Sequence, residues 1–381
     1  MPDQRLVARP RILHCLAHDG GAAAATVAAL AKELAGEAEH SVTFAEPSRG
    51  GSSLAGTVAT VATGFRALSG APSPGKLLRL AQMLAPYDLV LTHDYGALGA
   101  AMAHTAFSQM LRLPPLIHHE YGFGEDHIRE LAARRTWYRR IALGRAARLV
   151  VPTEYLEELA LTRWHQPIGR VTQIWPGVDL GRFVGLTRPD ALRGIVKHEG
   201  ESWIGTIGGM ESDGELLALV RAISRLADGW HLVIGGEGPA REAVRREAER
   251  LELSHRVHLP GRIDDRAAFM RLLDIYALTD GRAGFPAAIP EAMAAGLPIV
   301  APDLHAQSAV VGEENARFIV SPRAGEAGLA GAISELAGDM TLRLHAGRQN
   351  RMLAEARFDR STMIERFRAL YSSVLGREMR A

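Results

Sequence analysis

The strongest constraint on the fold is a repeated alternation of short apolar runs with helical segments. RILHCL at 11–16 is followed by a glycine turn and the alanine-rich segment AAAATVAALAKELA. The same order restarts at SWIGTIGGM (202–210), which leads into ELLALVRAISRLA. Strands that alternate with helices of this length are typical of parallel sheets. Because the pattern starts twice and 381 residues are enough for two domains, we expect an α/β protein with two parallel-sheet domains.

Composition places the chain among soluble globular proteins. Apolar residues make up 47% and charged residues 23%, and the net charge of +1 gives no general attraction to nucleic acid. The single cysteine, Cys15, excludes an internal disulfide and fits a reducing compartment. The N-terminus has no apolar signal core, and no apolar run approaches the roughly 20 residues that span a bilayer. We therefore expect a cytoplasmic protein.

The segment TDGRAGFPAAIPEAMAAGLPIVAP (279–302) is the most informative stretch for function. Glycines and prolines form its first part, and Glu291 follows Pro290 in the predicted first turn of a helix. A glycine-proline stop then leads into the apolar run at 299–301, which predicts a buried parallel strand. A glycine-rich loop, a helix start and one acid suit an anionic, hydroxyl-bearing ligand. An ordinary loop–helix–strand unit without a ligand is the alternative.

The arrangement GFP-x4-EAMA-x-GLP-IVA in this segment resembles the donor-site segment of glycosyltransferase family 4. Members of this family are retaining, nucleotide-sugar-dependent enzymes with the GT-B fold. IGGEGP (234–239) and VHLPGRI (257–263) are similar to the family as well. The resemblance implies two Rossmann-like domains that face each other across a cleft, with a C-terminal helix that crosses back to the first domain. It also implies a UDP or GDP sugar as substrate and no required metal.

The expected domains follow from this resemblance and from the repeated pattern. An N-terminal Rossmann-like acceptor domain covers 1–183 and ends after VTQIWPGVDLGRF. A C-terminal Rossmann-like donor domain covers 199–358. The last stretch, 359–381, is expected to form the helix that packs back on the first domain.

The resemblance assigns most of the donor contacts to the second domain. Glu291 would accept hydrogen bonds from the ribose hydroxyls, because a carboxylate offers two acceptor oxygens. Backbone amides would meet the sugar and the pyrophosphate, and glycine turns would pass close to the nucleotide. The remaining predicted donor-binding residues are Gly284, Phe285, Pro286, Ala287, Ala288, Gly209, Gly236 and Glu237.

Several family positions carry a different residue here. The first of two family glutamates is Ala283, and the arginine expected after the first strand of the second domain is Gly209. Asp213 or Gly214 replaces the expected lysine. Losing one charge-stabilising donor raises a barrier by roughly 3 to 4 kcal/mol, so losing several could abolish turnover. Two classes therefore stay open: an atypical sugar transferase, and a catalytically silent GT-B protein that binds a sugar, a nucleotide or a partner enzyme.

Four residues are candidates for a catalytic role. Arg262 and Arg282 lie near the donor loops and could replace the missing cations. In the first domain, family members often place a histidine at the end of the strand at 115–118. The alignment puts Tyr121 at that place, and a slip of one or two residues would put His119 or His118 there. The sequence leaves these alternatives open.

Further polar residues follow the first-domain strands. Gly20 and Gly21 form the turn after the first strand, and their amides could face a phosphate or an acceptor hydroxyl. His93 follows the strand at 88–92, at the edge where open α/β sheets bind ligands. The cluster of histidines and acids at 118–127 matches no compact metal-ligand spacing, so we expect a polar loop and no metal.

The segment Arg129–Arg148 carries seven arginines and one acid, with Trp137 and Tyr138 between them. A basic amphipathic helix of this kind could rest on an anionic membrane, which predicts peripheral contact with the inner membrane face. The alternative is a solvated helix face whose aromatic residues lie in the core.

Overall fold

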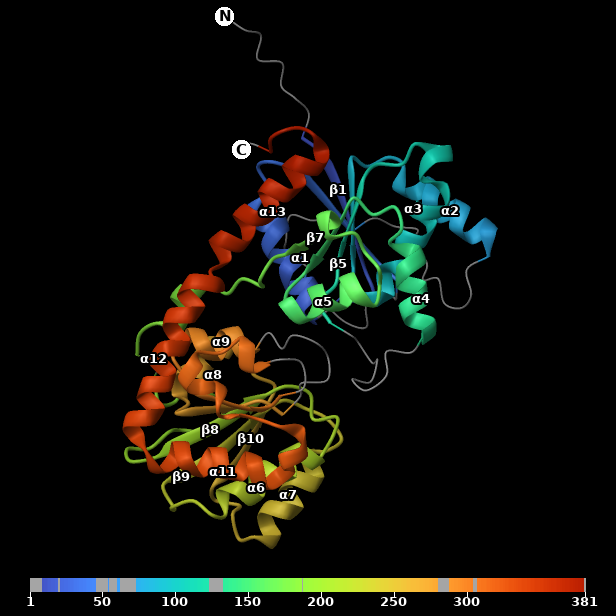
Figure 1. Cartoon of the computed structure of the whole chain (residues 1–381). Helices are drawn as coiled ribbons and strands as arrows, with labels where there is room; N and C mark the ends of the chain where they lie inside the picture. Colours follow the sequence, from blue (N-terminus) through green and yellow to red (C-terminus); the bar gives the residue numbers. More distant parts are fainter. Residues whose placement is uncertain are drawn as a thin grey trace, which may run out of the picture. The chain divides into compact units, whose positions relative to one another are not determined.

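The computed structural model describes residues 9–19, 21–45, 54, 60–61, 73–122, 133–186, 188–279, 288–303 and 307–379. Its contacts divide the chain into two compact units. Unit 1 contains residues 1–176 together with 361–381, and unit 2 contains residues 177–360 (Figure 1). The division falls at Gly177 rather than after Phe183. The reason is that the short helix η3 (Leu180–Phe183) packs against α8 and α9 of unit 2.

Unit 1 is built on a parallel sheet with strand order β3-β2-β1-β4-β5-β6-β7. The strands are β1 (Arg11–Leu16), β2 (Glu39–Phe44), β3 (Thr60–Val61), β4 (Leu89–His93), β5 (Leu116–His119), β6 (Arg148–Val151) and β7 (Val171–Gln173). Its helices are α1 (Gly21–Glu33), α2 (Pro74–Leu84), η1 (Tyr95–Ala97), α3 (Leu98–Leu111), α4 (Ala133–Ala142), α5 (Glu154–Thr162), η2 (Ile168–Arg170) and α13 (Arg360–Leu375).

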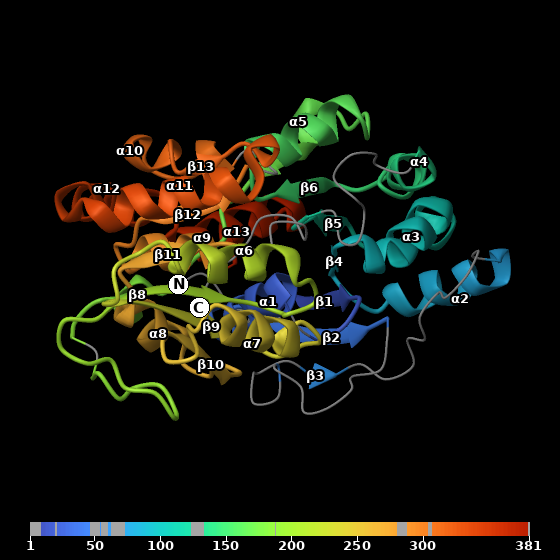
Figure 2. The same cartoon turned by 90° about the horizontal axis from the view of Figure 1, so that it is seen from below.

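Two hydrophobic clusters cover the two faces of this sheet. Helices α2, α3, α4 and α5 pack on one face, and α2, α3 and α4 lie in a row in Figure 2. On the other face, α1 and α13 pack over Ile12, Leu91 and Ile117. Helix α13 contributes the buried side chains of Phe367 and Tyr371 to this core. The last helix of the chain therefore completes the core of unit 1.

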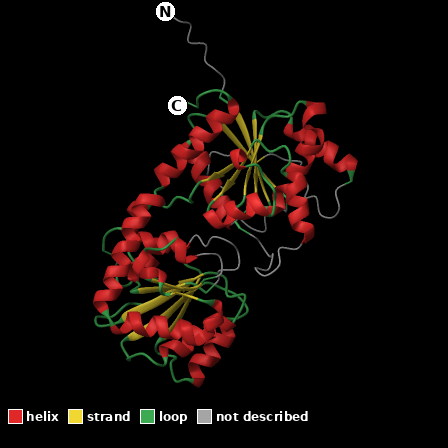
Figure 3. Ribbon diagram, in the orientation of Figure 1, coloured by secondary structure: helices red, strands yellow, loops and turns green. Residues whose placement is uncertain are grey.

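Unit 2 contains a second parallel sheet, with strand order β10-β9-β8-β11-β12-β13. The strands are β8 (Ser202–Ile207), β9 (Trp230–Gly235), β10 (Val257–Gly261), β11 (Ile275–Ala277), β12 (Ile299–Pro302) and β13 (Ile319–Val320). The helices are η3, α6 (Gly214–Ile223), α7 (Arg241–Arg250), α8 (Arg266–Leu272), α9 (Ala288–Ala294), η4 (Gln307–Ala309), α10 (Glu313–Ala316), η5 (Pro322–Ala324), α11 (Gly325–Gly338) and α12 (Met340–Arg357). Figure 3 shows helices flanking the strands in each unit.

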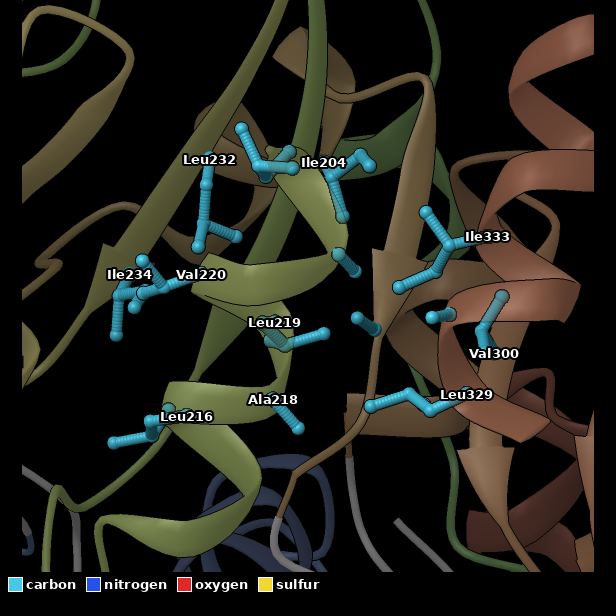
Figure 4. Packing of buried hydrophobic residues seen from close by; sticks show 14 of the residues in the cluster. Ile204, Leu216, Ala218, Leu219, Val220, Leu232, Ile234, Val300, Leu329 and Ile333 are labelled. Atoms are coloured by element: carbon cyan, nitrogen blue, oxygen red, sulfur yellow. The ribbon is translucent and has the colours of Figure 1, made fainter. Parts of the chain in front are cut away.

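The core of unit 2 lies between its sheet and helices α6, α7 and α11. Figure 4 shows Leu219 of α6 and Ile333 of α11 directed toward strand residues such as Ile204 and Val300. These side chains are at most 1% exposed. The β-branched strand residues predicted from the sequence thus form the sheet side of this core, as expected for strands buried on both faces.

Each sheet reverses its strand order once. In unit 1 the reversal lies between β1 and β4, and in unit 2 it lies between β8 and β11. Loops leaving neighbouring parallel strands in opposite directions open a crevice at the carboxyl ends of those strands. The turns after β1, β4, β8 and β11 are therefore the places where this fold is expected to bind a ligand. Two parallel α/β sheets are what the sequence predicted.

Candidate functional site

Two glycine turns pack against each other at the carboxyl edge of the unit 2 sheet. The amide of Gly208, after β8, donates to Gly235, and the amide of Met210 donates to Glu237. A Cβ on Gly236 would lie 1.9 Å from the Gly208 carbonyl oxygen, and the φ of Gly236 is +146°. Only glycine fits such a close backbone approach. The predicted donor residues Gly209, Gly236 and Glu237 are thus brought together at one edge of the sheet.

Glu291 lies in the first turn of α9, and its carboxylate already has a cationic partner. Arg266, the first residue of α8, donates from Nε at 2.8 Å and from Nη2 at 2.5 Å, both to Oε2 of Glu291. Burial alone would lower the pKa of Arg266, but the hydrogen bond and the charge of Glu291 raise it. Within the described part of the chain, Oε1 of Glu291 accepts no hydrogen bond. One carboxylate oxygen is therefore fixed and the other is available to a ligand.

Sequence reasoning missed Arg266. It is 25 residues away from Glu291 and belongs to another helix, so no local pattern links the two. The available signal was weak: Arg266 follows two aspartates at a predicted helix start, where Asp265 caps the helix by accepting from Ala267 and Ala268. Only the packing of α8 against α9 brings the arginine to the acid.

Of the two arginines that the sequence proposed, Arg262 and Arg282, the structure describes only Arg262. Arg262 lies in the turn after β10; its side chain is 85% exposed and pairs with Asp264. Arg282 lies outside the described residues. So do Ala283, Gly284, Phe285, Pro286 and Ala287, while Ala288 begins α9.

The turn after β8 is acidic. Glu211 and Asp213 are exposed beside Gly209, where a diphosphate clamp would need positive charge. Gly209 itself does not need to be glycine. A Cβ there would meet only the side chain of Glu211, at 3.5 Å, and its φ is not in the left-handed region. The backbone could therefore carry an arginine at this position.

In unit 1, the turns after β1 and β4 touch each other. A Cβ on Gly96 would lie 2.3 Å from the Cβ of Ala17. Gly21 begins α1 with a φ of +75°, and Gly20 lies outside the described residues. Asp94, directly after β4, also has a left-handed φ of 57° and accepts from the amide of Tyr121 at 2.9 Å. A non-glycine residue in this region stores strain, which is common at functional sites.

The ring of His93 is fully buried instead of facing the strand-end surface. Its Nε2 lies 3.2 Å from Nδ1 of His14, and its Nδ1 lies 3.4 Å from the Tyr121 hydroxyl. Burial, together with the nearby His119 and His14, lowers the pKa of His93 far below its usual value. A direct ligand contact of this ring would therefore require one of these bonds to break.

The two histidines proposed as alternatives to Tyr121 at the end of β5, His118 and His119, lie on opposite faces of the sheet. His119 is 1% exposed on the α13 face, and its ring packs against Phe367 and Tyr371. His118 points to the opposite face, where its Nδ1 lies 2.8 Å from the Thr92 hydroxyl. Tyr121 is half-buried beyond the strand end. Adjacent strand residues alternate between faces, which is why a slip of one residue changes the environment completely.

A small open pocket of about 10 Å³, which has room for about one water molecule, adjoins this strand end within unit 1. Its polar wall contains Thr26, His119, Glu120 and Tyr121, and its apolar wall includes Trp175 and Phe367. Neither ring nitrogen of His119 has a hydrogen-bond partner among the described residues. The pocket thus combines aromatic residues with unsatisfied polar groups, in a space that admits a single small polar group.

A buried ion pair fixes the other side of the same strand end. Arg139 of α4 donates to Glu120 from Nε at 2.9 Å, and both side chains are 0% exposed. Nε2 of His118 lies 3.5 Å from the same carboxylate. Burial alone would raise the pKa of Glu120, but Arg139 and His118 lower it to about 2. Burial and the Glu120 charge raise the pKa of Asp94 to about 7.

The described residues contain no group of three or more His, Cys, Asp or Glu side chains arranged to hold a metal ion. No helix in the described ranges is long and apolar enough to cross a bilayer. Residues 123–132, which include the end of the predicted polar loop, lie outside the description.

The two aromatic residues of the basic segment Arg129–Arg148 lie in different environments. Tyr138 packs against the hydrophobic cluster of α3 and α4, whereas Trp137 is 58% exposed. Ile141, one turn further along α4, is 38% exposed. Since Arg139 is buried in its pair with Glu120, the outward face of α4 presents Trp137 and Ile141 with exposed Arg134 and Arg140.

Comparisons with known proteins agree with this architecture. The family model described as Glycosyltransferase Family 4 matches residues 20–182, and the one described as Glycosyl transferases group 1 matches residues 201–339. A GDP-mannose-dependent alpha-mannosyltransferase of Mycolicibacterium smegmatis is 30% identical over 186 residues, which are 48% of this chain and 46% of the relative. An uncharacterized glycosyltransferase of Haemophilus influenzae is 33% identical over 23% of this chain and 24% of its own length. The chain thus spans less than half the length of these curated relatives.

Solved structures match over nearly the whole chain. Anabaena HepE in complex with UDP has a TM-score of 0.79 at 18% identity, with 95% of this chain and 100% of HepE covered. Sucrose-phosphate synthase from Thermosynechococcus elongatus has a TM-score of 0.73 at 19% identity, with 97% and 100% covered. The two sheets, their strand-end crevices and these likenesses define a protein with the fold of GT-B glycosyltransferases. Within that class, the chain belongs to the family 4-like glycosyltransferases.

Proposed function

We propose that this protein transfers a sugar from a UDP or GDP sugar to an acceptor with retention of configuration. The observation that carries the proposal is the carboxyl edge of the unit 2 sheet. There, packed glycine turns border the strand-order reversal, and Glu291 keeps one carboxylate oxygen on Arg266 while the other is available. A carboxylate that is held in this way is suited to a ribose diol, because its orientation is set before the ligand arrives.

The choice of nucleotide follows from two likenesses that point in different directions. The Mycolicibacterium relative is named for GDP-mannose, and the HepE structures hold UDP. Both bases therefore belong in the first experiment, which is isothermal titration with UDP and with GDP. Binding of either nucleotide supports the donor site. No heat with either, together with no hydrolysis of any UDP or GDP sugar, would favour a catalytically silent protein.

Replacement of Glu291 tests the site directly. We expect Glu291→Gln to weaken nucleotide binding about 10-fold, because a charge-assisted hydrogen bond is lost. Glu335→Gln is a matched control, since Glu335 is also a helical glutamate paired with an arginine, Arg317, but lies on α11. Equal affinities of wild type and Glu291→Gln would contradict the proposed role of Glu291.

A silent binding protein is the second candidate, and a specific observation favours it. Glu211 and Asp213 are exposed in the turn where a diphosphate would need cations, and Gly209 supplies none. Unless Arg266 or Arg262 approaches the phosphates, negative charge on the leaving group stays uncompensated. Single-turnover hydrolysis of a bound nucleotide sugar separates the two candidates: binding without any turnover identifies the silent protein.

We also propose that the reaction needs no metal ion and that acceptor chemistry takes place beside unit 1. The available cations, Arg262 and Arg266, would take the part that a divalent ion plays in metal-dependent transferases. Activity should then be unchanged by EDTA, and restoration only by added Mg²⁺ or Mn²⁺ would refute this.

Peripheral contact with an anionic membrane is proposed for the outward face of α4. Trp137 and Ile141 would insert between lipid headgroups, and Arg134 and Arg140 would contact the phosphates. Arg170 donates to the Gly144 carbonyl, which holds the turn with the 76% exposed Ile168 beside the end of α4. Co-sedimentation with phosphatidylglycerol vesicles should exceed that with phosphatidylcholine vesicles and fall in Trp137→Ala. Equal binding to both vesicles would contradict the proposal.

A further inference from the structure

Four histidines form a row on one face of the unit 1 sheet. His40 of β2, His14 of β1, His93 of β4 and His119 of β5 all lie on the face that α1 and α13 cover, and each is at most 3% exposed. Packing does not explain four polar rings there, because the same face is otherwise built from Ile, Leu and Val residues. Buried polar groups are retained where they hydrogen-bond.

Three members of the row are connected through their ring nitrogens. Nδ1 of His40 lies 2.9 Å from Nε2 of His14, and Nδ1 of His14 lies 3.2 Å from Nε2 of His93. The last contact runs from Nδ1 of His93 to the Tyr121 hydroxyl, at 3.4 Å. The rings are also stacked, at 5.2 Å for His40 and His14 and at 5.4 Å for His14 and His93.

If every contact in the row is a hydrogen bond between neutral rings, the protons can be arranged in only two ways, which we call the two proton orders. Each neutral imidazole carries one N–H, so a donor at one ring forces the role of the next. In the first order every histidine carries its proton on Nε2, and the Tyr121 hydroxyl donates to Nδ1 of His93. In the second order every proton sits on Nδ1, and His93 donates to the Tyr121 oxygen.

One chemical preference favours the first order, which leaves Nε2–H of His40 without a partner among the described residues. Free neutral imidazole prefers the Nε2–H form, which the first order gives to all three rings. The Tyr121 proton is then directed to His93. Burial lowers the pKa of each of the three histidines, so the row stays neutral near pH 7.

Other polar groups around the row do not complete a competing network. Asp94 bonds the Tyr121 amide, Glu120 faces Arg139 on the opposite side of the sheet, and His119 meets His93 edge to face at 4.6 Å. On the α13 side the ring of Tyr371 stacks on His119 at 6.2 Å, and its hydroxyl has no hydrogen-bond partner in the described ranges.

We propose that His40, His14 and His93 act as one unit whose single proton order makes Tyr121 donate inward and leaves its oxygen as an acceptor for a ligand hydroxyl. His14 and His40 are then positioning residues, which act through His93. The pocket beside Tyr121 is lined by Trp175 and Phe367 and has room for a group the size of one hydroxyl. The assignment of a sugar hydroxyl rests on the proposed transferase function, whereas the proton order does not.

The test is 15N NMR of the full chain labelled at histidine, which shows which ring nitrogen carries the proton. We expect His14, His40 and His93 to be neutral Nε2–H tautomers from pH 8 to pH 6. His14→Leu removes the acceptor for His93, so the share of its Nδ1–H form should rise about fivefold, the factor that one ordinary hydrogen bond supplies. His14→Asn retains an acceptor oxygen near the Nδ1 position and should keep the wild-type tautomer of His93.

The control is His104→Leu, which removes a buried histidine of α3 that bonds only the Pro114 carbonyl and lies outside the row. It should leave the signals of His93 unchanged. Mixed tautomers in the wild type, an Nδ1–H form of His93, or no change in His14→Leu would each overturn the proposal. If His14→Leu does not fold, Tyr121→Phe serves instead, because loss of the inward donor must shift the Nδ1 signal of His93.

Titration of the labelled protein with methyl α-D-glucopyranoside and methyl α-D-mannopyranoside then tests the ligand side. A shift at His93 that disappears in Tyr121→Phe supports the acceptor role of Tyr121, and no shift with either glycoside at high concentration counts against that role. The predicted proton order in a protein that binds neither UDP nor GDP would refute the transferase function alone.

Discussion

At the scale of single residues, Gly209 is the position where the sequence predicts the arginine of family 4 members to be absent. A side chain fits there without backbone strain, because a Cβ on Gly209 would lie 3.5 Å from its nearest neighbour, the Cγ of the Glu211 side chain. We expect Gly209→Arg to tighten binding of UDP or GDP about 10-fold, because an arginine would supply a charge-assisted bond to the diphosphate. Isothermal titration measures the gain.

The control for this prediction is Gly236→Ala in the neighbouring turn. Its Cβ would lie 1.9 Å from the Gly208 carbonyl oxygen, so this variant should lose both stability and nucleotide binding. If Gly209→Arg folds normally and binds no tighter, Gly209 does not occupy the position of the family arginine.

Sequence reasoning found isolated members of the site better than it found their partners. Glu291 was predicted from a local motif, and the structure adds that Arg266 holds one of its oxygens. His93 was predicted from its place after a strand, yet its ring belongs to a buried row with His14 and His40. Such partners are set by strand register and helix packing. A single sequence carries no signal for contacts between residues that are 26 and 79 positions apart.

At the scale of elements, the ion pair of Glu120 and Arg139 attaches α4 to the end of β5. Both side chains are fully buried, so removing one charge leaves the other in a medium that stabilises it poorly. We expect Glu120→Gln to lower the free energy of unfolding by about 3 to 5 kcal/mol, measured by urea denaturation. The double variant Glu120→Met with Arg139→Met should recover most of this loss, because two apolar side chains leave no unpaired charge.

The matched control is Asp190→Asn, which breaks the exposed pair of Arg188 and Asp190. Exposed pairs contribute about 0 to 1 kcal/mol, so this variant should unfold like the wild type. A small effect of Glu120→Gln would mean that α4 is held by its hydrophobic contacts alone.

The elements themselves were largely predictable, because apolar strand runs and glycine turns are local signals. Strands β1, β4, β5, β8 and β12 begin and end within a few residues of the predicted runs. The unit boundary was less predictable. The segment 177–183 has the composition of a connecting turn, but Arg182 pairs with Asp265 and Phe183 is buried, so tertiary contacts assign it to unit 2. Likewise, only packing decides that Tyr138 turns inward while Trp137 stays exposed.

At the scale of the whole molecule, the buried histidines make stability depend on pH. Burial lowers the pKa of His14, His40, His93 and His119, to about 4 for His40 and about 3 for His119. Between about pH 6.5 and pH 4 the unfolded chain binds a proton at each histidine and the folded chain does not, so acid favours unfolding. Asp94 opposes this, because its folded pKa of about 7 means that the folded chain holds a proton which the unfolded chain has released.

The four histidines outweigh Asp94, so these five groups alone give a net uptake of about three protons on unfolding near pH 5. They should lower the free energy of unfolding by about 4 kcal/mol per pH unit there, and the lowered pKa values of His104, His231 and His258 act in the same direction. Thermal denaturation followed by circular dichroism from pH 8 to pH 4.5 checks the sign, and His14→Asn should flatten the curve by about one proton. A melting temperature that rises as the pH falls from 6.5 to 5 would contradict the buried, neutral histidines.

The division into units makes a last prediction about how the chain folds. Unit 1 is completed by α13, whose Met363, Ile364, Phe367 and Tyr371 are at most 5% exposed. Each such side chain contributes about 1.5 to 3 kcal/mol on burial, so together they match the entire stability of an ordinary domain. A chain that ends at residue 360 should therefore lose the cooperative unfolding of unit 1 and keep that of unit 2.

The fragment 177–360 should fold alone, because its core is made from its own sheet and from α6, α7 and α11. Calorimetry should show one transition for this fragment and for the chain ending at residue 360. Within the full chain, Phe367→Ala should destabilise unit 1 by about 3 to 5 kcal/mol, whereas Arg366→Ala on the exposed side of the same helix should change little. If the truncated chain still unfolds with a native-like unit 1 transition, α13 is an accessory to that core and not a part of it.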